Sequence, residues 1–240
     1  MFASVRFHIA APCKTVDYYA KILSYDWLRL SNYVFAFVLA RAVWTAPWRA
    51  LWRNNVQFNA MIGLTLWLGV LWLLPVGVRD GLKLHPLGAT LCFLMFDWEI
   101  ASLMLSILLV VSLLYNGASL IALGSIGLVM IVLPVMATRL FFRLFQRFGK
   151  KNYFSFILWN GYFCGILTML LVGLCNGLLV VAFGTYSWFT IKNVYLAFLP
   201  VISFTESFLT GAFISGFAAF LPNAVAHFDP DIYFAKKPPD

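Results

Sequence analysis

The sequence has few charged residues for its length. Only 11% of its 240 residues are Asp, Glu, Lys or Arg, whereas soluble domains have about 25%. Hydrophobic residues make up 62%, against roughly 45–50% in soluble domains. A soluble fold of this size must cover its surface with polar groups, and this chain has too few of them. The composition therefore excludes a soluble domain and a disordered chain, and it indicates a membrane protein.

The chain also lacks the common catalytic motifs. It contains no Walker loop, no Ser/His/Asp set and no His-Glu-x-x-His motif, which argues against an ATPase or a metalloprotease within it. Its four cysteines include no Cys-x-x-Cys pair, and three of them lie in apolar runs, where a thiol packs as a small hydrophobe. Charged residues and a proline interrupt the first apolar residues, so we expect no cleavable signal peptide. We also expect no tightly bound cofactor.

What the sequence does contain is a series of long apolar runs. A helix needs about 20 apolar residues to cross a bilayer core of about 30 Å. Unbroken runs, rather than a period of two, favour helices over a transmembrane barrel. We therefore predict an all-α polytopic membrane protein with about seven transmembrane helices. The runs lie at about 28–46, 58–78, 84–96, 100–115, 118–138, 153–183 and 194–221.

The 84–115 region is predicted to form two short crossings. A single helix over this region would be about 48 Å long at 1.5 Å per residue, which is too long for the bilayer. Asp97 and Glu99 interrupt the apolar residues, so we place a tight acidic turn there. The chain then divides into an N-terminal leader at 1–27 that lies at the interface, a transmembrane domain at 28–221 and a polar C-terminal tail at 222–240.

The net charge is +8, and the strongest basic cluster in any connection lies at 139–151. Arg139, Arg143 and Arg147 lie four residues apart, on one helix face, and two lysines follow them. The positive-inside rule places this cluster in the cytoplasm. Seven crossings then put the C-terminus in the cytoplasm and the N-terminus outside, whereas six crossings would bring the leader inside. We expect these arginines to contact partner subunits or anionic lipids, and we expect no nucleic-acid partner.

One acidic residue lies deep in an apolar run. Glu206 is near the middle of 194–221, where a charged side chain costs at least about 2.5–3.5 kcal/mol. Thr210 lies one turn further on the same face. Small residues recur every four positions along this run: Ser203, Ser207, Gly211, Ser215 and Ala219. Such a face lets another helix approach closely, so we expect Glu206 and Thr210 beside a packed interface, in a structural or a functional role.

Two further polar residues are candidates for a cavity or a metal site. His85 opens the third run, and imidazole is a ligand for nickel, copper, zinc or cobalt; a hydrogen-bonded structural histidine is the alternative. Asn160 lies in the sixth run next to Gly161 and Gly165, whose Gly-x-x-x-Gly spacing is typical of helix packing. In the tail, His227, Asp229 and Asp231 have the residue types of a metal site but the spacing of a solvated segment.

Several short segments, taken in their order along the chain, are similar to one family. They are Ala46-Pro47-Trp48-Arg49, His85-Pro86-Leu87-Gly88-Ala89-Thr90, Asn160 with Gly165, Tyr186-Ser187-Trp188, Phe204-Thr205-Glu206-Ser207-Phe208-Leu209-Thr210-Gly211, and Phe228-Asp229 with Tyr233. Over about residues 25–235 the chain resembles the CbiM/NikM-like membrane components of energy-coupling factor transporters, of the cobalt/nickel type.

The resemblance implies a function, partners and a site. It implies a substrate-capture, permease-like subunit in a bacterial inner membrane, working with a transmembrane coupling subunit and with separate ATPase subunits, so that the chain itself is not an enzyme. It also implies that the transported ion is nickel, cobalt or a related ion such as copper. In the family this ion is held by a free Met-His N-terminus together with the histidine that matches His85.

The start of the chain differs from the family pattern. It reads Met1-Phe2-Ala3 rather than Met-His, and His8 lies too far before the first crossing to fit the family's spacing. An alternative function is therefore a non-transporting accessory or assembly subunit of a metalloenzyme complex. An intramembrane enzyme is a third interpretation, although neither Glu206 nor His85 has an obvious catalytic partner in the sequence.

Overall fold

The computed structural model describes residues 23–73, 87–115, 119–149, 151–182 and 187–234. His85, His8 and most of the leader therefore lie outside the described residues. All regular structure in the described part is helical. The longer helices are α2 (Tyr25–Thr45), α4 (Asn55–Leu73), α5 (Ala89–Tyr115), α7 (Leu133–Phe148), α9 (Cys164–Ala182) and α11 (Leu196–Phe220).

Shorter helical segments connect or extend these helices. The α-helical ones are α3 (Trp48–Arg53), α6 (Leu123–Gly127), α8 (Tyr153–Ser155), α10 (Trp188–Thr190) and α12 (Pro230–Tyr233). Three π-helical segments, η2 (Leu128–Val132), η3 (Phe156–Phe163) and η4 (Ile191–Tyr195), continue directly into α7, α9 and α11. Single 3₁₀ turns, η1 (Leu120–Ala122) and η5 (Pro222–Ala224), lie at a helix start and in the C-terminal segment.

Five helical stretches within the described residues are long and apolar enough to cross a membrane: Asn55–Leu73, Ala89–Tyr115, Leu120–Phe148, Tyr153–Ala182 and Trp188–Phe220. The helix α2 has 21 residues but is more polar, since it carries Asp26, Arg29 and Arg41. The prediction of an all-α polytopic membrane protein is confirmed. Each of the seven apolar runs is helical in its described part, while the count of seven complete crossings stays a prediction.

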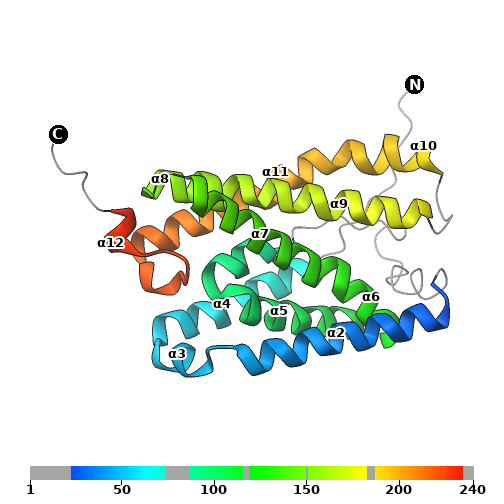
Figure 1. Ribbon diagram of the computed structural model, residues 1–240, viewed down its shortest axis with the longest axis horizontal. Coiled ribbons are helices and arrows are strands. Elements are labelled where there is room, and N and C mark those ends of the chain that lie inside the picture. The colour runs from blue at the N-terminus through cyan, green and yellow to red at the C-terminus, as the bar shows by residue number, and fades with distance from the viewer. Residues whose placement is uncertain (1–22, 74–86, 116–118, 150, 183–186, 235–240) are drawn as a thin grey trace.

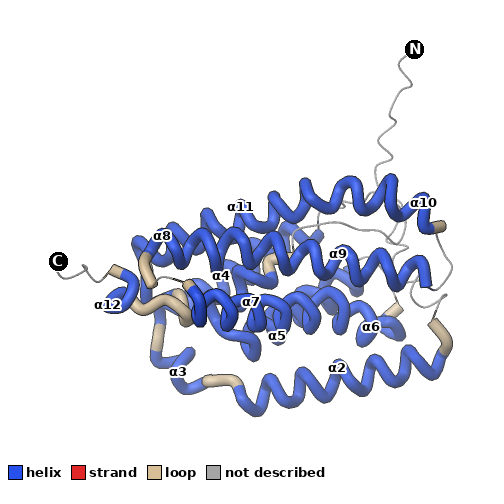
Figure 2. The backbone as a smooth tube through the Cα atoms, turned by 45° about the horizontal axis from the view of Figure 1, so that its top comes forward, coloured by secondary structure: helices blue, strands red, loops and turns tan. Residues whose placement is uncertain are grey.

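The helices form three layers (Figures 1 and 2). Helix α2 lies along one side, α9 and α11 along the other, and α4, α5 and α7 fill the space between them. The segments α3, α8 and α12 lie at one end of the bundle, which we call the α12 end, and α6 and α10 lie at the opposite end. Helix α2 begins at the α6/α10 end, whereas the last described helix, α12, lies at the opposite end.

Helix α5 is a hairpin rather than one continuous rod. Asp97 has φ 67° and ψ 175°, a backbone conformation that is not helical. The side chain of Leu68 covers Gly88, and that of Leu108 reaches the neighbouring Gly69. In a straight helix Gly88 and Leu108 would lie about 30 Å apart at 1.5 Å per residue. The chain therefore reverses at Asp97, and the expected acidic turn is present.

The two arms of this hairpin differ in length. The described helical part of the first arm, Ala89–Phe96, is about 12 Å long, which is less than half of the bilayer core. The second arm, Trp98–Tyr115, is about 27 Å long and crosses most of it. We call them the short arm and the long arm. The interpretation of 84–115 as two crossings is thus matched by one long arm, and by a short arm that is too short to span in its described part.

Two of the π-helical segments, η2 and η4, lie shortly before a proline, whereas η3 does not. Pro134 follows η2 and Pro200 follows η4, and a proline removes one N–H donor and its ring clashes with the carbonyl four residues earlier. A wider π turn accommodates such a disturbance without ending the helix. Near Pro134 the disturbance therefore takes the form of a π-helical turn inside a continuous 29-residue stretch.

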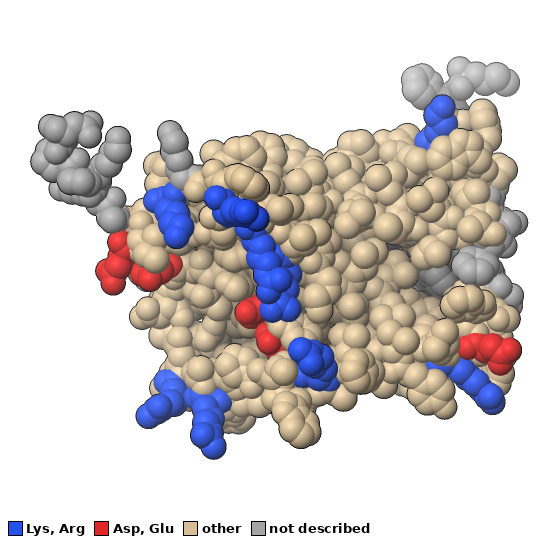
Figure 3. Space-filling view, in the orientation of Figure 1, with Lys and Arg blue, Asp and Glu red and all other residues tan. Residues whose placement is uncertain are grey.

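The outer surface of the bundle is largely apolar. Large hydrophobic side chains such as Leu66, Ile107 and Phe208 are more than half exposed, and uncharged residues cover most of the face shown in Figure 3. In water such a surface would be a broad patch prone to association, but against lipid tails it is matched. The exposed apolar surface thus agrees with the membrane assignment.

Candidate functional site

The chain just after His85 is held by Glu206. The backbone N–H of Gly88 donates hydrogen bonds to the Glu206 carboxylate, at 3.0 Å to Oε1 and 3.3 Å to Oε2. These two residues are 118 positions apart in the sequence. Glu206 is only 3% exposed, on α11, so this contact lies inside the bundle. The expected position of Glu206 beside a packed interface is what the structure has.

Gly88 is a position that needs glycine. Its φ is +70°, in the left-handed region that side chains disfavour, and a Cβ there would lie 2.5 Å from the Leu68 side chain. Its carbonyl accepts the first hydrogen bond of the short arm, from the Cys92 N–H at 2.9 Å. Gly88 is therefore the N-cap of the short arm, and Glu206 supplies a carboxylate where the helix dipole is positive.

The other end of the short arm is also held by hydrogen bonds. The carbonyl of Met95 accepts from Gln57 Nε2 at 3.0 Å and from the Ala226 N–H at 3.1 Å, and that of Leu94 accepts from the His227 N–H at 3.3 Å. These carbonyls have no partner within the arm because the chain turns at Asp97. Both ends of a short helix are thus satisfied inside the bundle, as a membrane environment demands.

A chain of hydroxyl groups joins the short arm to two other helices. Thr90 Oγ1 lies 3.2 Å from Thr138 Oγ1 of α7, which in turn lies 3.2 Å from Thr168 Oγ1 of α9. All three are almost completely buried. Together with Glu206, they make the start of the short arm a polar junction of four helices. Sequence reasoning missed Thr138 and Thr168, since a single threonine in an apolar run is not distinctive by itself.

Close packing of small residues positions α11 for this contact. A Cβ added at Gly161 would lie 3.3 Å from Gly211 Cα, and one added at Gly165 would lie 3.1 Å from Ser207 Cα. The α11 backbone therefore approaches η3 and α9 more closely than side chains of ordinary size allow. The small-residue face expected on 194–221 and the glycine pair of the sixth run are the two sides of this interface.

The row of small residues predicted to line this interface, from Ser203 to Ala219 in steps of four, is wrong at its last position, because Ala219 is exposed. Steps of four residues advance about 40° more than a full turn of a 3.6-residue helix. After four steps the row has rotated away from the interface, and Ala218, not Ala219, is buried there.

The other expected polar residues divide between the centre and one end of the bundle. Thr210 is 1% exposed on α11, one turn beyond Glu206. Asn160 is also buried, but with Gln146 and Tyr233 it lines a small pocket near α12. Gln146 Nε2 donates to the Tyr233 hydroxyl at 2.6 Å, and burial raises the pKa of that hydroxyl above its ordinary value. Among the described residues, the side-chain oxygen of Asn160 has no hydrogen-bond partner, and Glu206 bonds to Gly88 instead.

The C-terminal residues with metal-ligand chemistry do not converge. His227 stacks on the Phe93 ring and makes a tilted contact with the Phe142 ring, at centroid distances of 4.8 and 4.6 Å, and its Nε2 lies 3.8 Å from Asp97 Oδ1. Asp229 instead caps α12 by accepting from the Asp231 N–H at 3.0 Å. His227 is thus packed against the hairpin tip, and the expectation of a solvated segment is wrong for it. In the described part of the chain, no three His, Cys, Asp or Glu side chains are grouped as metal ligands.

The arginines of α7 lie along one face at the α12 side of the molecule. Arg139 is half-buried and its guanidinium lies 5.3 Å from the centre of the Trp98 ring, whereas Arg143 and Arg147 are exposed. Figure 3 shows basic side chains in a diagonal stripe over this region, with acidic groups beside it. Arg49 and Arg53 belong to α3, which lies at the same end.

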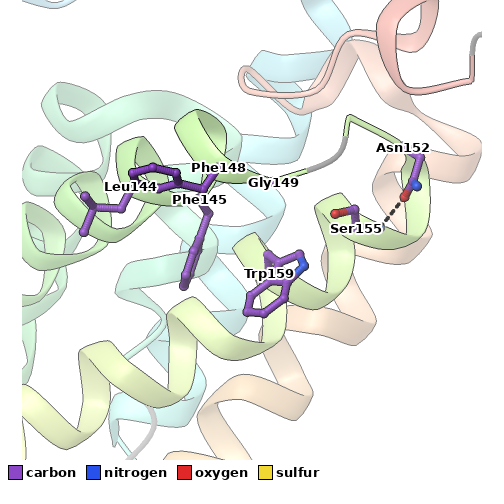
Figure 4. Close-up of a pocket in the computed structure, with 7 residues that line it drawn as sticks. All are labelled: Leu144, Phe145, Phe148, Gly149, Asn152, Ser155 and Trp159. Carbon is purple, nitrogen blue, oxygen red and sulfur yellow. Dashed lines mark hydrogen bonds between the residues drawn. The ribbon is translucent and has the colours of Figure 1, made fainter.

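A cleft of about 700 Å³ opens between the end of α7 and the start of η3. Its walls are Leu144, Phe145, Phe148 and Trp159 (Figure 4). Asn152 lies at its edge, where its Oδ1 accepts a hydrogen bond of 2.7 Å from the Ser155 N–H and caps α8. The cleft is apolar, but it adjoins the exposed arginines of α7.

The comparison with protein families gives one match. The model for the cobalt uptake substrate-specific transmembrane region, CbiM, matches residues 19–224. No curated protein and no solved structure matches the chain. The match includes His85, Glu206, the α5 hairpin and all of the longer helices, and with it the resemblance drawn from short segments of the sequence is confirmed. The chain therefore belongs to the CbiM family, the substrate-specific transmembrane components of cobalt uptake.

Proposed function

We propose that the chain is the substrate-capture component of an energy-coupling-factor-type importer in a bacterial inner membrane, with cobalt, nickel or a related ion such as copper as the cargo. The observation that carries the proposal is the contact between Gly88 and Glu206. It fixes the chain three residues after His85, the one histidine that the resemblance assigns to the ion. The family is a membrane transport component for cobalt uptake, which supports this role.

In this proposal His85 is a ligand of the ion and Glu206 is a positioning residue. Three residues of chain span at most about 11 Å, so an anchored Gly88 limits the region that the His85 imidazole can reach. Glu206 uses its carboxylate on a backbone N–H and is thereby engaged in holding the turn. A nitrogen ligand such as imidazole suits the later first-row divalent ions.

Thr210 and Asn160 have supporting roles in the proposal. Thr210 belongs to the polar core next to Glu206, where its small side chain leaves room for η3 to approach α11. Asn160 belongs to the packing around α12. The chain needs no resident cofactor for these roles. It is proposed not to be an enzyme, since ATP hydrolysis would take place on separate subunits.

The α12 end is proposed as the cytoplasmic end. Arg49 and Arg53 of α3 and Arg147 in the last turn of α7 belong to it, in keeping with the positive-inside rule. The N-terminus then lies outside and the C-terminus in the cytoplasm. The coupling subunit is proposed to place an amphipathic helix in the apolar cleft beside Phe148 and Trp159, because apolar grooves with a polar rim bind such helices. Arg139, Arg143 and Arg147 would contact this partner or anionic lipid headgroups.

The test is the metal content of detergent-purified protein, measured by mass spectrometry after loading with cobalt, nickel or copper. We expect near-stoichiometric metal in the wild type and its loss in His85→Ala. His227→Ala is the matched control, because it removes another histidine and should leave the metal content unchanged. Wild-type protein without metal, or a His85→Ala variant with full metal content, would sink the capture role and favour the accessory or assembly subunit.

A further inference from the structure

A further cavity lies between α2, α7 and the tip of the α5 hairpin. Its volume is about 240 Å³. Arg41 of α2, Arg139 of α7 and Glu99 of the long arm all line it, and Trp98 and Met136 complete its inner wall. None of these residues takes part in the metal-capture site proposed above, so the following inference does not rest on that function.

Helices α2 and α7 each contribute one apolar and one charged side chain to the cavity, in the same order along the chain. On α2, Val38 precedes Arg41 by three residues, and on α7, Met136 precedes Arg139 by three residues, and all four line the cavity. Both helices run towards the α12 end, so on each of them the apolar side chain lies one turn deeper in the membrane than the arginine. The cavity therefore has a charged rim towards the α12 end and an apolar floor towards the membrane centre.

The charged side chains at the rim form no direct ion pairs with one another. Among the described residues, neither guanidinium has a carboxylate oxygen within 4 Å; the ion pair found there joins His227 and Asp97. Arg139 instead lies over the Trp98 ring, which holds it at the rim. Two arginines and one glutamate therefore line the cavity beside an apolar floor, and Asp97 at the hairpin tip is a further acidic group whose charge acts on Arg139.

We propose that this cavity binds one glycerophospholipid, with its headgroup phosphate between Arg41 and Arg139. Arginine is suited to phosphate because its planar fork donates two parallel hydrogen bonds. The volume corresponds to about eight water molecules, which is the size of a phosphate carrying a short alcohol. Glu99 at the same rim faces the end of that alcohol, so the preferred headgroup carries an amine, as in phosphatidylethanolamine. The acyl chains run over Val38 and Met136 into the bilayer.

The test is native mass spectrometry of the delipidated full chain in non-ionic detergent, titrated with phosphatidylethanolamine. We expect one bound lipid, and affinity weakened about tenfold or more in Arg41→Gln and in Arg139→Gln, because each removes charge-assisted hydrogen bonds to phosphate. Arg143→Gln is the matched control, since Arg143 lies one turn further on α7, is exposed and does not line the cavity. It should keep the wild-type affinity.

Two further variants separate the cavity from general surface charge. Met136→Trp fills the apolar floor without changing any charge, and we expect it to lose the lipid while its thermal unfolding in detergent stays cooperative. Glu99→Gln should lose the preference for phosphatidylethanolamine over phosphatidylglycerol. Equal weakening by Arg143→Gln, or unchanged binding in Met136→Trp, would show adsorption to a basic surface instead. Displacement of the lipid by inorganic phosphate at equal concentration would show a free-anion site. Each of these results would overturn the proposal.

Discussion

The two arms of the α5 hairpin are adjacent in sequence and similarly apolar, but they differ in burial and in the contacts that hold them. The residues of the short arm from Ala89 to Phe96 are all buried, and its ends are held by hydrogen bonds with α4, α11 and the C-terminal segment. The long arm has an ordinary lipid-facing side, where Ile107 and Leu114 are 60% exposed. The long arm is held by packing, whereas the short arm is also fixed by polar contacts.

The long arm therefore belongs to the scaffold of the bundle, whereas contacts at its two ends determine where the short arm lies. A membrane helix that spans most of the bilayer has its end groups near the water interface, but an arm of eight residues has them inside the protein. The partners of those groups determine where the arm lies. One of them, Glu206, sets the position of the turn that follows His85. The comparison therefore predicts that polar or backbone changes at the short arm affect the site, and that changes on the long arm do not.

The largest effect is expected from Gly88→Ala. A side chain must adopt the left-handed φ of +70°, and its Cβ meets Leu68. We expect a loss of about 2–4 kcal/mol from backbone strain and overpacking together. Thermal unfolding in detergent and cobalt binding measure the two consequences. Gly63→Ala is the control, because a Cβ there meets nothing within 4 Å; a Gly88→Ala protein as stable as Gly63→Ala would contradict the assigned turn.

A smaller effect is expected from Thr90→Val, which keeps the shape of the side chain and removes its hydroxyl. The Thr138 hydroxyl then loses one partner in the buried chain that joins the short arm to α7 and α9. The expected loss is about 0.5–1.5 kcal/mol. Thr65→Val is the matched control, since the Thr65 hydroxyl donates to the Met61 carbonyl of its own helix. If both variants unfold at the same temperature, the hydroxyl chain does not anchor the arm.

The smallest effect is expected from Ile107→Ala on the lipid-facing side of the long arm. The side chain is 60% exposed to the surroundings of the bundle, so its removal leaves little cavity behind. We expect a change below about 0.5 kcal/mol in stability and no change in cobalt affinity. A strong loss of affinity in this variant would show that both arms position the site, and the distinction between them would fail.

Properties that are local in the sequence were predicted well. The helical membrane class follows from the apolar runs, and the turn at Asp97 from an acidic interruption in one of them. That α11 and the sixth run each carry a close-packing face follows from the small residues around Glu206 and from Gly161 and Gly165, although the sequence did not show that these two faces meet each other. Each of the predicted features can be derived from a stretch of about 30 residues.

Properties that depend on distant pairs were not predicted. No local pattern shows that Glu206 contacts Gly88, 118 residues away, or that Thr90, Thr138 and Thr168 form one buried chain. The packing of His227 against Phe93 and Phe142 was missed for the same reason, because a histidine beside two aspartates suggests a polar tail. The left-handed glycine gave a weak signal, as Gly88 lies two residues after Pro86 and directly before a helix.

The central claim is that Glu206 holds the turn that presents His85, and cobalt titration of the detergent-purified chain tests it most directly. Glu206→Gln keeps an oxygen that accepts from the Gly88 N–H, whereas Glu206→Ala leaves that buried N–H without a partner, at a cost of about 1–3 kcal/mol. We expect Glu206→Ala to weaken cobalt binding about tenfold or more and Glu206→Gln to bind nearly as the wild type. Wild-type affinity in Glu206→Ala would contradict the positioning role. A loss as severe in Glu206→Gln as in Glu206→Ala would also contradict it, because it would make the carboxylate charge itself the feature that matters.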